Sequence, residues 1–510
     1  MTRFDGGKEQ LRRFNPSSEP ENITTTAGEI SFSSDIDTVT IKLNHWESAM
    51  LQITNADNDS AFIHIYRRAV NPYENPPLDI QTVASSGMLT RQQAIFDIDA
   101  LIDGISNVHP DMFSVCKQTE FFHAVNKLKQ SIPDSIGIPE LYLNLTRIVS
   151  MLGDGHTHLL LPEEIVLTDS EYFMPLFINV TPEKSLKTIW CKGNMIPYNS
   201  DIISINGISA DSLIINMLPL ESGERDHFKL MRVNYDFTGL FKLMYPADKY
   251  DIAYHTNKSK NVKTVTLYPE KWDKIKSHFA VNQDNLSTTP YSYTIDTSQN
   301  LAILDFKSFR DENQMKFFAD SMFRELRDKN IDNLIIDLRE NGGGNSMVGD
   351  ILLRYICPTP FIQMDKILIR ITPLTTRLLN ARNDTAEFTL IESPESDYIQ
   401  PLSTDNGFYK GNIYLLTSSK TFSAAASFAW LFSQCGIGKI IGEETGGMNV
   451  SFGDKVWYKL PVSGLECGIS FKRFWQFQAD ESSIHGAIPD IYVPANDALS
   501  KAISFIKSKQ

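Results

Sequence analysis

The segment MLGDGHTHLLLP, residues 151–162, places two histidines one residue apart between an acidic turn and an apolar run. Two imidazoles can share a bound metal ion, whereas a single imidazole can accept and return a proton near neutral pH. The chain has only 10 histidines. The roles of His156 and His158 therefore largely decide which chemistry the protein could perform.

A second segment, LRENGGGNSM (338–347), puts three glycines between an apolar strand and a helix. Glycines leave backbone N–H groups unobstructed, and the helix start adds positive potential, so the segment could hold an anion or an oxyanion. It could equally be a tight turn from strand to helix. It fits neither G-x-x-x-x-G-K-[ST] nor G-x-G-x-x-G, so we do not expect a nucleotide phosphate there.

A third segment, TSSKTFSAAASFAW (417–430), places Ser423 at the start of an alanine-rich helix. A serine in this position can be an N-cap, worth about 1 kcal/mol. It can also be a nucleophile, because the next N–H, from Ala424, would face the oxyanion that the attack creates. No G-x-S-x-G is present, so the nucleophile elbow of the α/β hydrolases is absent.

The H-x-H spacing also resembles that of metal-dependent amidohydrolase barrels, in which two imidazoles share a cation. That class needs further ligands at later strand ends. The histidines after His158 are His227, His255, His278 and His485, and none of them ends an apolar strand. We therefore expect no metal and no other cofactor, and we keep the amidohydrolase as a rival hypothesis.

The elements that must position these residues follow from hydrophobic periodicity. Residues 90–152 show helical spacing, so GDGHTHL would follow the last helix of a small helical domain. Residues 170–268 read as strands, with an Asn-Gly turn in DIISINGIS. From about residue 291, apolar strands alternate with helices, which predicts a parallel sheet covered by helices. The N-terminal part reads as a polar tail over 1–28, then alternating strands and a proline-rich linker.

Composition limits the partners. The net charge is −14 and no Lys/Arg-rich run occurs, which disfavours nucleic acid and anionic membranes. No apolar run is long enough to span a bilayer. The five cysteines are widely spaced and suggest neither a disulfide scaffold nor a zinc ribbon. Because the N-terminus lacks a signal-peptide core, we expect a cytoplasmic protein as given; a secreted or periplasmic protein without its leader would look the same. The oligomeric state is not readable.

In combination these segments closely resemble the S41 peptidases, the family of C-terminal processing proteases, the tricorn protease core and the retinoid-binding repeats of photoreceptors. The resemblance rests on the order of five motifs over roughly residues 90–510: L-x-D-G-H-T, I-x-N-G, IIDLRENGGG, TSSKTFSAA with IGEETGG, and GAIPDIYV. It implies a multi-domain α/β protein. The implied parts are a tail (1–28), an N-terminal β-rich segment and linker (29–85), a helical domain carrying the histidine motif (86–165), a PDZ-like domain (166–270) and a ClpP/crotonase-like α/β core (285–510).

The resemblance also implies roles for individual residues. Ser423 would be the nucleophile, and the N–H groups of Gly343 and Ala424 would form the oxyanion hole. One branch of the family activates its serine with a lysine, but Met448 occupies the matching position and Lys455 is a poor substitute. The tricorn-like branch uses a histidine, and His156 occupies that position. An imidazole near its ordinary pKa of about 6.5 is the better base at neutral pH.

Around His156 the sequence departs from the tricorn-like pattern. Gly155 replaces a serine that helps to orient the histidine, so the relay would be shortened. Glu481 lies where an orienting glutamate is expected, and Asp154 is the alternative. Ala426, often acidic in similar sequences, is a further departure. We therefore predict a serine peptidase acting on peptides or unfolded protein tails, with a non-catalytic S41-like binding module as the main rival.

Overall fold

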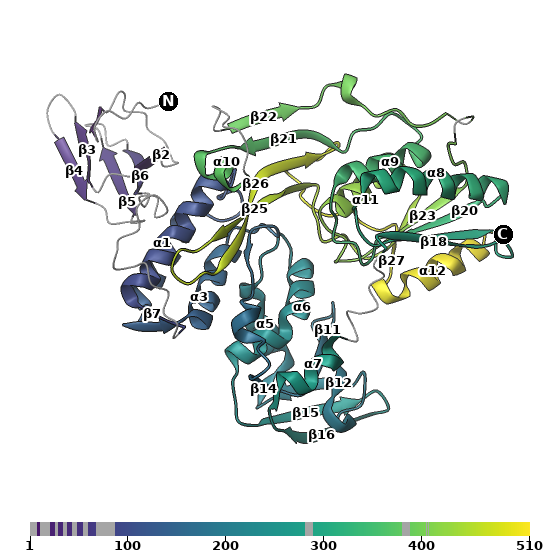
Figure 1. Cartoon of the computed structure of the whole chain (residues 1–510). Helices are drawn as coiled ribbons and strands as arrows, with labels where there is room; N and C mark the ends of the chain where they lie inside the picture. The colour runs from purple at the N-terminus through teal and green to yellow at the C-terminus, as the bar shows by residue number, and fades with distance from the viewer. Residues whose placement is uncertain are drawn as a thin grey trace.

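The computed structural model describes residues 87–280, 289–379, 388–403, 405 and 407–509, together with six strands between residues 8 and 67 (Figure 1). The six strands form two three-stranded sheets, ordered β1-β3-β4 and β2-β6-β5. Two of them fall where a polar tail was predicted, and the β-branched run ITTT favours one of these, β2. The bounds are β1 (Lys8–Gln10), β2 (Glu21–Thr25), β3 (Glu29–Ser33), β4 (Thr38–Lys42), β5 (Ser48–Thr54) and β6 (Ser60–Arg67).

From residue 87 on, where the structure is described, three helices precede the histidine segment: α1 (Arg91–Val108), α2 (Gln118–Ser131) and α3 (Ile138–Ser150). A capping box between Thr90 and Gln93 begins α1, where each side chain accepts from the other's backbone N–H. The short strands β7 (Met88–Thr90) and β8 (Ser135–Gly137) pair beside them. Helices α2 and α3 each bury one apolar face, as their spacing predicts, whereas α1 is buried all round from Ala100 to Ser106. Helix α3 leads into the loop 151–157 and strand β9 (His158–Leu159).

Residues 163–280 form a six-stranded antiparallel sheet and a separate two-stranded one, with helices against them, at the bottom of Figure 1. At the predicted Asn-Gly turn, Asn206 and Gly207 both have positive φ, 49° and 79°. The sheet order is β11-β12-β13-β15-β16, with β14 on β13. The strands are β10 (Tyr172–Phe173), β11 (Leu176–Val180), β12 (Leu186–Cys191), β13 (Asp201–Ile205), β14 (Ile208–Ser209), β15 (Tyr250–Thr256), β16 (Ser259–Leu267) and β17 (Glu270–Lys271). The helices here are α4 (Glu163–Val166), η1 (Lys192–Asn194), α5 (Ala210–Met217), η2 (Leu218–Leu220), α6 (Asp226–Met244) and α7 (Trp272–Ala280).

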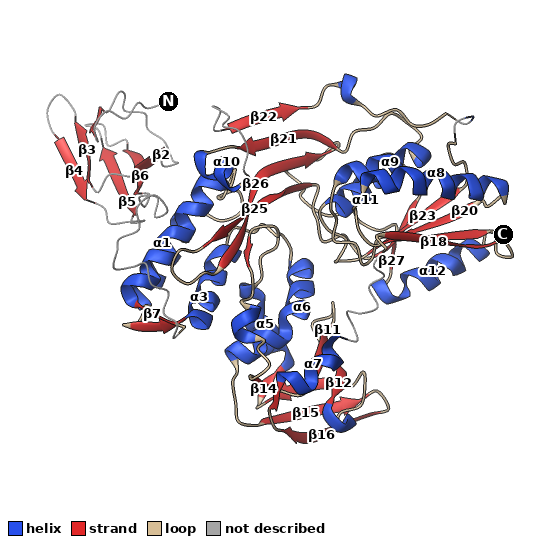
Figure 2. Cartoon of the chain, viewed as in Figure 1, coloured by secondary structure: helices blue, strands red, loops and turns tan. Residues whose placement is uncertain are grey.

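The C-terminal part is an α/β unit whose sheet has the order β18-β19-β20-β23-β24-β27. All neighbours are parallel except β18 and β19. Leu334 and Ile336 face a cluster with α8, α9 and α11, whereas Ile335 faces α12 on the other side (Figure 2). The strands are β18 (Tyr291–Asp296), β19 (Leu301–Phe306), β20 (Asn333–Asp337), β23 (Asn412–Thr417), β24 (Lys439–Gly442) and β27 (Ile491–Tyr492). The helices are α8 (Glu312–Asp328), α9 (Ser346–Ile356), α11 (Ala424–Gln434) and α12 (Ala495–Lys507).

Because β20 and β23 are parallel neighbours, with Asp337 opposite Leu416, their carboxyl ends meet at one edge of the sheet. The glycine loop follows β20 and the Ser423 loop follows β23. The mixed α/β fold is thus as predicted. It brings these two segments together because the loops that follow neighbouring parallel strands lie at the same edge of the sheet.

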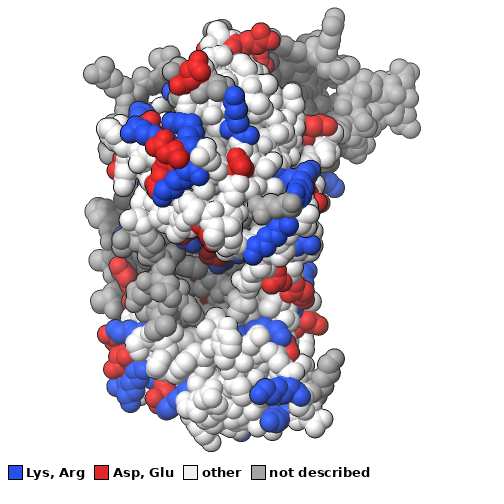
Figure 3. Space-filling model, turned by 90° about the vertical axis from the view of Figure 1, so that its right-hand side faces the viewer, with Lys and Arg blue, Asp and Glu red and all other residues white. Residues whose placement is uncertain are grey.

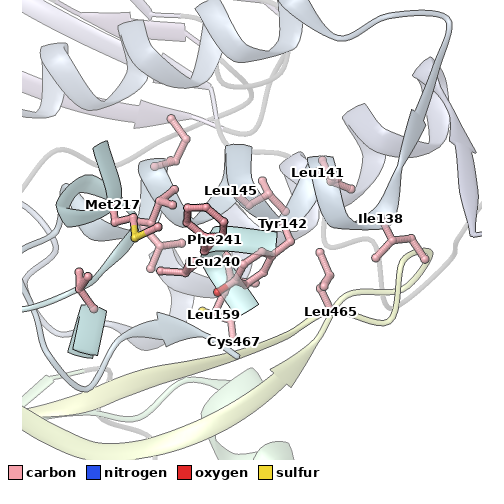
Figure 4. Packing of buried hydrophobic residues seen from close by; sticks show 14 of the residues in the cluster. Ile138, Leu141, Tyr142, Leu145, Leu159, Met217, Leu240, Phe241, Leu465 and Cys467 are labelled. Carbon is pink, nitrogen blue, oxygen red and sulfur yellow. The ribbon is translucent and has the colours of Figure 1, made fainter. Parts of the chain in front are cut away.

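A second sheet, ordered β22-β21-β26-β25, carries a long hairpin toward the helical part (Figure 1). Strand β9 adds to β26, with Leu159 opposite Cys467. Figure 4 shows Leu465 and Cys467 of the hairpin packed with Tyr142 of α3, Leu159 and Phe241 of α6 in one apolar cluster. The remaining elements are β21 (Met364–Arg370), α10 (Pro373–Leu378), β22 (Phe388–Glu392), η3 (Glu395–Asp397), β25 (Val450–Lys459) and β26 (Glu466–Gln476).

The surface in Figure 3 shows basic and acidic side chains interspersed rather than separated into fields of one sign. Among the residues that the structure describes, no helix is both long enough and apolar enough to cross a bilayer.

Asp97 of α1 anchors the tip of the hairpin. Its side chain is fully buried, and its two oxygens accept the backbone N–H groups of Val462 (2.9 Å) and Ser463 (2.6 Å). Burial raises the pKa of Asp97 to about 6, although the bonds to Ser463 and Val462 oppose this.

We expect Asp97→Asn to lower the free energy of unfolding by about 1–3 kcal/mol, because the amide leaves one buried N–H without an acceptor. Urea denaturation at pH 7.5 would measure the change. Asp320→Asn, in an exposed ion pair with Arg324 on α8, is the control and should change the free energy of unfolding by less than about 0.5 kcal/mol. Equal effects of the two substitutions would contradict the anchoring role.

Candidate active site

Ser423 occupies a strained turn between β23 and α11. Its φ and ψ are 52° and −129°, a region that residues other than glycine rarely adopt. The turn is held by the Phe422 N–H, which donates to the Asn341 carbonyl (3.1 Å), and by the Thr421 hydroxyl, which donates to the Leu338 carbonyl (2.8 Å). Ser423 is the N-cap residue of α11 by position, but its side chain makes no capping hydrogen bond. The hydroxyl is therefore not engaged in capping and is half-buried at the loop surface.

The glycine loop lies directly against Ser423. Gly343 has φ of 100°, and a Cβ on it would lie 2.7 Å from the Phe422 carbonyl oxygen and 2.8 Å from Ser423 Cβ. Only glycine fits there. The Gly343 N–H donates to Asn341 Oδ1 (2.8 Å). The Ala424 N–H, in contrast, has no partner among the hydrogen bonds of the described residues, as expected in the first turn of a helix.

Asn341 is a residue of this loop that the sequence analysis did not single out. Its side chain is fully buried, and its Nδ2 donates to the Phe306 carbonyl (2.7 Å). It thus ties the glycine loop to the sheet while its own carbonyl holds Phe422. An asparagine two residues before a glycine turn was the available signal, since such side chains often accept a nearby backbone N–H.

His156 lies in the loop between α3 and β9, next to Phe422. Its ring stacks on Phe422, the neighbour of Ser423, with centroids 4.5 Å apart and planes at 28°. The side chain is 13% exposed. Among the described residues, no hydrogen bond joins Ser423 to His156 or to His158. His158 points toward the hairpin: its Nδ1 bonds to the His156 carbonyl (3.0 Å), and its ring meets Trp457 edge-on at 6.0 Å.

Asp154 lies behind His156 and is fully buried. Its Oδ1 accepts the His156 backbone N–H (2.8 Å) and lies 3.9 Å from His156 Nδ1. Its Oδ2 accepts the Ser470 hydroxyl (2.7 Å) and lies 3.3 Å from His109 Nε2. Burial alone would raise the pKa of Asp154, but the interactions with His109 and His156 outweigh it and hold that pKa well below its usual range.

The structure places Asp154, and not Glu481, beside His156. Glu481 is 49% exposed, accepts the Trp475 indole N–H (2.7 Å) and pairs with Arg473 (3.1 Å) at the end of β26. The Glu481 carboxylate is thus engaged by Trp475 and Arg473. The family pattern favours Glu481 by its position in the sequence, whereas the burial that distinguishes Asp154 has no signature in a short motif.

Gly155 has no space for the serine of the tricorn-like pattern. A Cβ there would lie 2.8 Å from Phe228, 2.9 Å from Phe422 and 3.0 Å from Glu224 Oε2. Phe228, from α6, itself stacks on Phe422 with centroids 4.2 Å apart. Helix α6 therefore contributes to the site, which the sequence analysis missed because no motif marks it.

Glu224 is a second site residue without a sequence signal. Both of its carboxyl oxygens are buried, and neither has a hydrogen-bond partner among the described residues. Burial, and then the charge of Asp154, raise the pKa of Glu224 to about 8. We therefore expect this side chain to be neutral at pH 7.

The described residues do not form the arrangement in which a lysine activates the serine. Met448 is buried, and the ammonium group of Lys455 lies over the Trp457 ring, 4.5 Å from its centroid. Burial lowers the pKa of Lys455, and its charge in turn helps to lower the pKa values of His156 and His158. Among the described residues, no three His, Cys, Asp or Glu side chains are grouped as metal ligands.

Known proteins share parts of this sequence and fold. Residues 300–493 match the family model of peptidase family S41. The structure of mature CPAF complexed with lactacystin has a TM-score of 0.60 at 12% identity, covering 82% of this chain and 97% of that one. Mature CPAF alone gives 0.58 at 12% identity, covering 82% and 96%. A photosystem II D1 C-terminal processing protease gives 0.38 at 15% identity, covering 80% and 94%. At such identities the CPAF likeness shows a shared fold.

Proposed function

We propose that this chain is a serine-type peptidase of family S41, whose family model matches residues 300–493, with Ser423 as its nucleophile and His156 as its general base. The observation that carries the proposal is the conformation of Ser423. A purely structural role does not explain a serine held at positive φ at the N-cap of a helix, with a hydroxyl that makes no capping hydrogen bond. The His156 ring, stacked on the adjacent Phe422, supplies the nearby base.

In the proposed reaction, Ser423 Oγ attacks the carbonyl carbon of the scissile peptide bond while His156 takes the hydroxyl proton. The Ala424 N–H and the positive end of α11 stabilise the resulting oxyanion. We assign the second donor to Gly343, whose N–H would exchange Asn341 Oδ1 for the oxyanion. The C–N bond then breaks as His156 protonates the leaving amine, and water hydrolyses the acyl-enzyme with His156 again as base.

Asp154 orients His156 in this proposal. Its carboxylate faces Nδ1 at 3.9 Å, which leaves Nε2 for the serine hydroxyl. A carboxylate in this place fixes the tautomer of the imidazole and stabilises the imidazolium that forms. Substrate binding would turn the ring from its stack on Phe422 toward Oγ, since catalytic hydrogen bonds are often incomplete without substrate.

We further propose that residues 166–270 form a PDZ-like module and residues 285–510 a ClpP/crotonase-like core. The antiparallel sheet β11–β16 with α5 and α6 supports the first, and the parallel sheet flanked by helices supports the second. The edge strands β11 and β16 of the module could pair with an extended peptide. Peptides or unfolded protein tails are therefore the expected substrates.

A fluorophosphonate probe tests the assignment of the nucleophile. We expect stoichiometric labelling of the full chain, with the adduct on the peptide that contains Ser423 when the protein is digested and analysed by mass spectrometry. Lactacystin, the compound in the CPAF complex, should protect that serine. A chain that is neither labelled nor active on a peptide library would instead be a non-catalytic binding module.

The pH dependence of kcat/KM should reflect the burial of His156. Burial lowers the pKa of His156 to about 4, although the charge of Asp154 opposes this. The neutral imidazole is the active form, so kcat/KM should fall only as the pH drops through about 4, rather than near 6.5. Initial rates from brief assays, with folding checked by tryptophan fluorescence, would measure this limb. A limb centred near 6.5 would contradict the buried environment.

A further inference from the structure

Asp154 can orient His156 only if something orients Asp154, and the loop that carries it is short. The carboxylate is held from a different part of the chain. Its Oδ2 faces His109 Nε2 at 3.3 Å, and both side chains are completely buried. His109 is the C-cap residue of α1, far from the histidine loop in sequence.

The hydrogen bonds of His109 define which ring nitrogen carries its proton. The Asp111 backbone N–H donates to Nδ1 (3.2 Å), so Nδ1 is the unprotonated nitrogen. The ring hydrogen is then on Nε2, where it points at Asp154. His109 is therefore a donor to the carboxylate.

The His109 ring has little freedom to turn away. It packs on Phe452 of β25, with ring centroids 4.6 Å apart. Its backbone carbonyl accepts the Arg370 guanidinium (2.9 Å) from β21. Its position is thus set by α1 and by two strands of the second sheet.

We propose that His109 is a positioning residue of the peptidase, acting through Asp154 on His156. This proposal rests on the proposed function. It assigns one carboxylate oxygen of Asp154 to His156 and the other to His109 and Ser470. A buried carboxylate with both oxygens directed by donors stays ionised and cannot rotate. Without the His109 donor, Asp154 would lose its alignment with His156 Nδ1, and the imidazolium formed during attack would be less stabilised.

Two polar substitutions distinguish a hydrogen bond from His109 to Asp154 from a role of His109 in packing alone. In His109→Gln the amide nitrogen can take the place of Nε2 and reach Asp154. In His109→Asn the amide oxygen can take the place of Nδ1 and keep the bond from Asp111, but the side chain is too short to reach Asp154. We expect His109→Asn to lower kcat by roughly 10- to 100-fold with little change in KM, and His109→Gln to recover most of that loss.

The decisive measurement is a double-mutant cycle on the full chain, with kcat and KM for one peptide substrate and the melting temperature of each variant. If His109 acts through Asp154, then His109→Asn combined with Asp154→Asn should lose no more kcat than Asp154→Asn alone. His255→Asn is the matched control, since His255 pairs with Asp201 (3.2 Å) in the β11–β16 sheet, and it should leave kcat unchanged.

Three results would overturn the role of His109: wild-type kcat in a folded His109→Asn variant, equal losses in the Gln and Asn variants, or losses that multiply in the cycle. Should His109→Asn not fold, a His109→Gln variant with its kcat reduced at an unchanged melting temperature would equally overturn it. A wild-type chain that neither cleaves peptides nor reacts with the fluorophosphonate would refute the proposed function instead.

Discussion

Replacing Ser423 by alanine should lower kcat for peptide hydrolysis by roughly 10⁴- to 10⁶-fold and abolish fluorophosphonate labelling. The substitution removes the only atom that we propose forms the acyl-enzyme. The proposed oxyanion donors remain, so KM should change little. The fold should also survive, because the Ser423 hydroxyl makes no capping bond that alanine would lose.

The comparison for Ser423→Ala is Ser433→Ala, near the other end of the same helix, where the side chain is exposed. Ser433→Ala should leave kcat and labelling unchanged. Rates measured with a fluorogenic peptide, on protein whose melting temperature has been checked, would separate the two variants. Substantial activity or labelling in Ser423→Ala would show that another residue is the nucleophile.

His156→Ala should lower kcat by a comparable roughly 10³- to 10⁶-fold, because the serine hydroxyl would have no adjacent base. Fluorophosphonate labelling of Ser423 should become slower without disappearing, because the nucleophile remains. The expected change is in kcat, since His156 is proposed to bind no part of the substrate. Stopped assays at long incubation times, with the labelling rate from mass spectrometry, would measure both effects.

The two histidines of the H-x-H segment should behave differently. His158 bonds to the His156 carbonyl and packs against Trp457. His158→Ala should therefore lower the melting temperature, and kcat only modestly. Equal and large losses of kcat in His156→Ala and His158→Ala, both folded, would mean that the pair acts as a unit and that His156 alone is not the base.

The parts of the fold that the sequence predicted are those with local signals. Continuous apolar strands alternating with helices predicted the parallel sheet. The residue types Asn and Gly predicted the turn at Asn206-Gly207. The hairpin β25–β26 was not predicted. It forms because β9 and Asp97, hundreds of residues earlier in the chain, provide partners for it, and such distant pairing leaves no pattern in a short window.

The same distinction applies to the site. Ser423, Ala424 and the glycine loop lie in segments whose residue types are unusual, and the parallel sheet brings them together. Asp154 was only an alternative to Glu481, because its advantage is burial among His109, Ser470 and the His156 loop. Phe228 and Glu224 come from a helix and a loop with ordinary sequences, and only the packing of α6 against Phe422 makes them part of the site.

The central claim is that His156 serves Ser423, and the most direct test is a crystal structure of the chain after reaction with diisopropyl fluorophosphate. We predict a phosphoryl group on Ser423 Oγ, a His156 ring nitrogen within about 3.2 Å of Oγ or of a phosphoryl oxygen, and another phosphoryl oxygen accepting the Ala424 N–H. A phosphoryl group on a different residue would contradict the claim. So would an adduct on Ser423 that leaves His156 stacked on Phe422 and beyond hydrogen-bond distance of both the serine oxygen and the phosphoryl group.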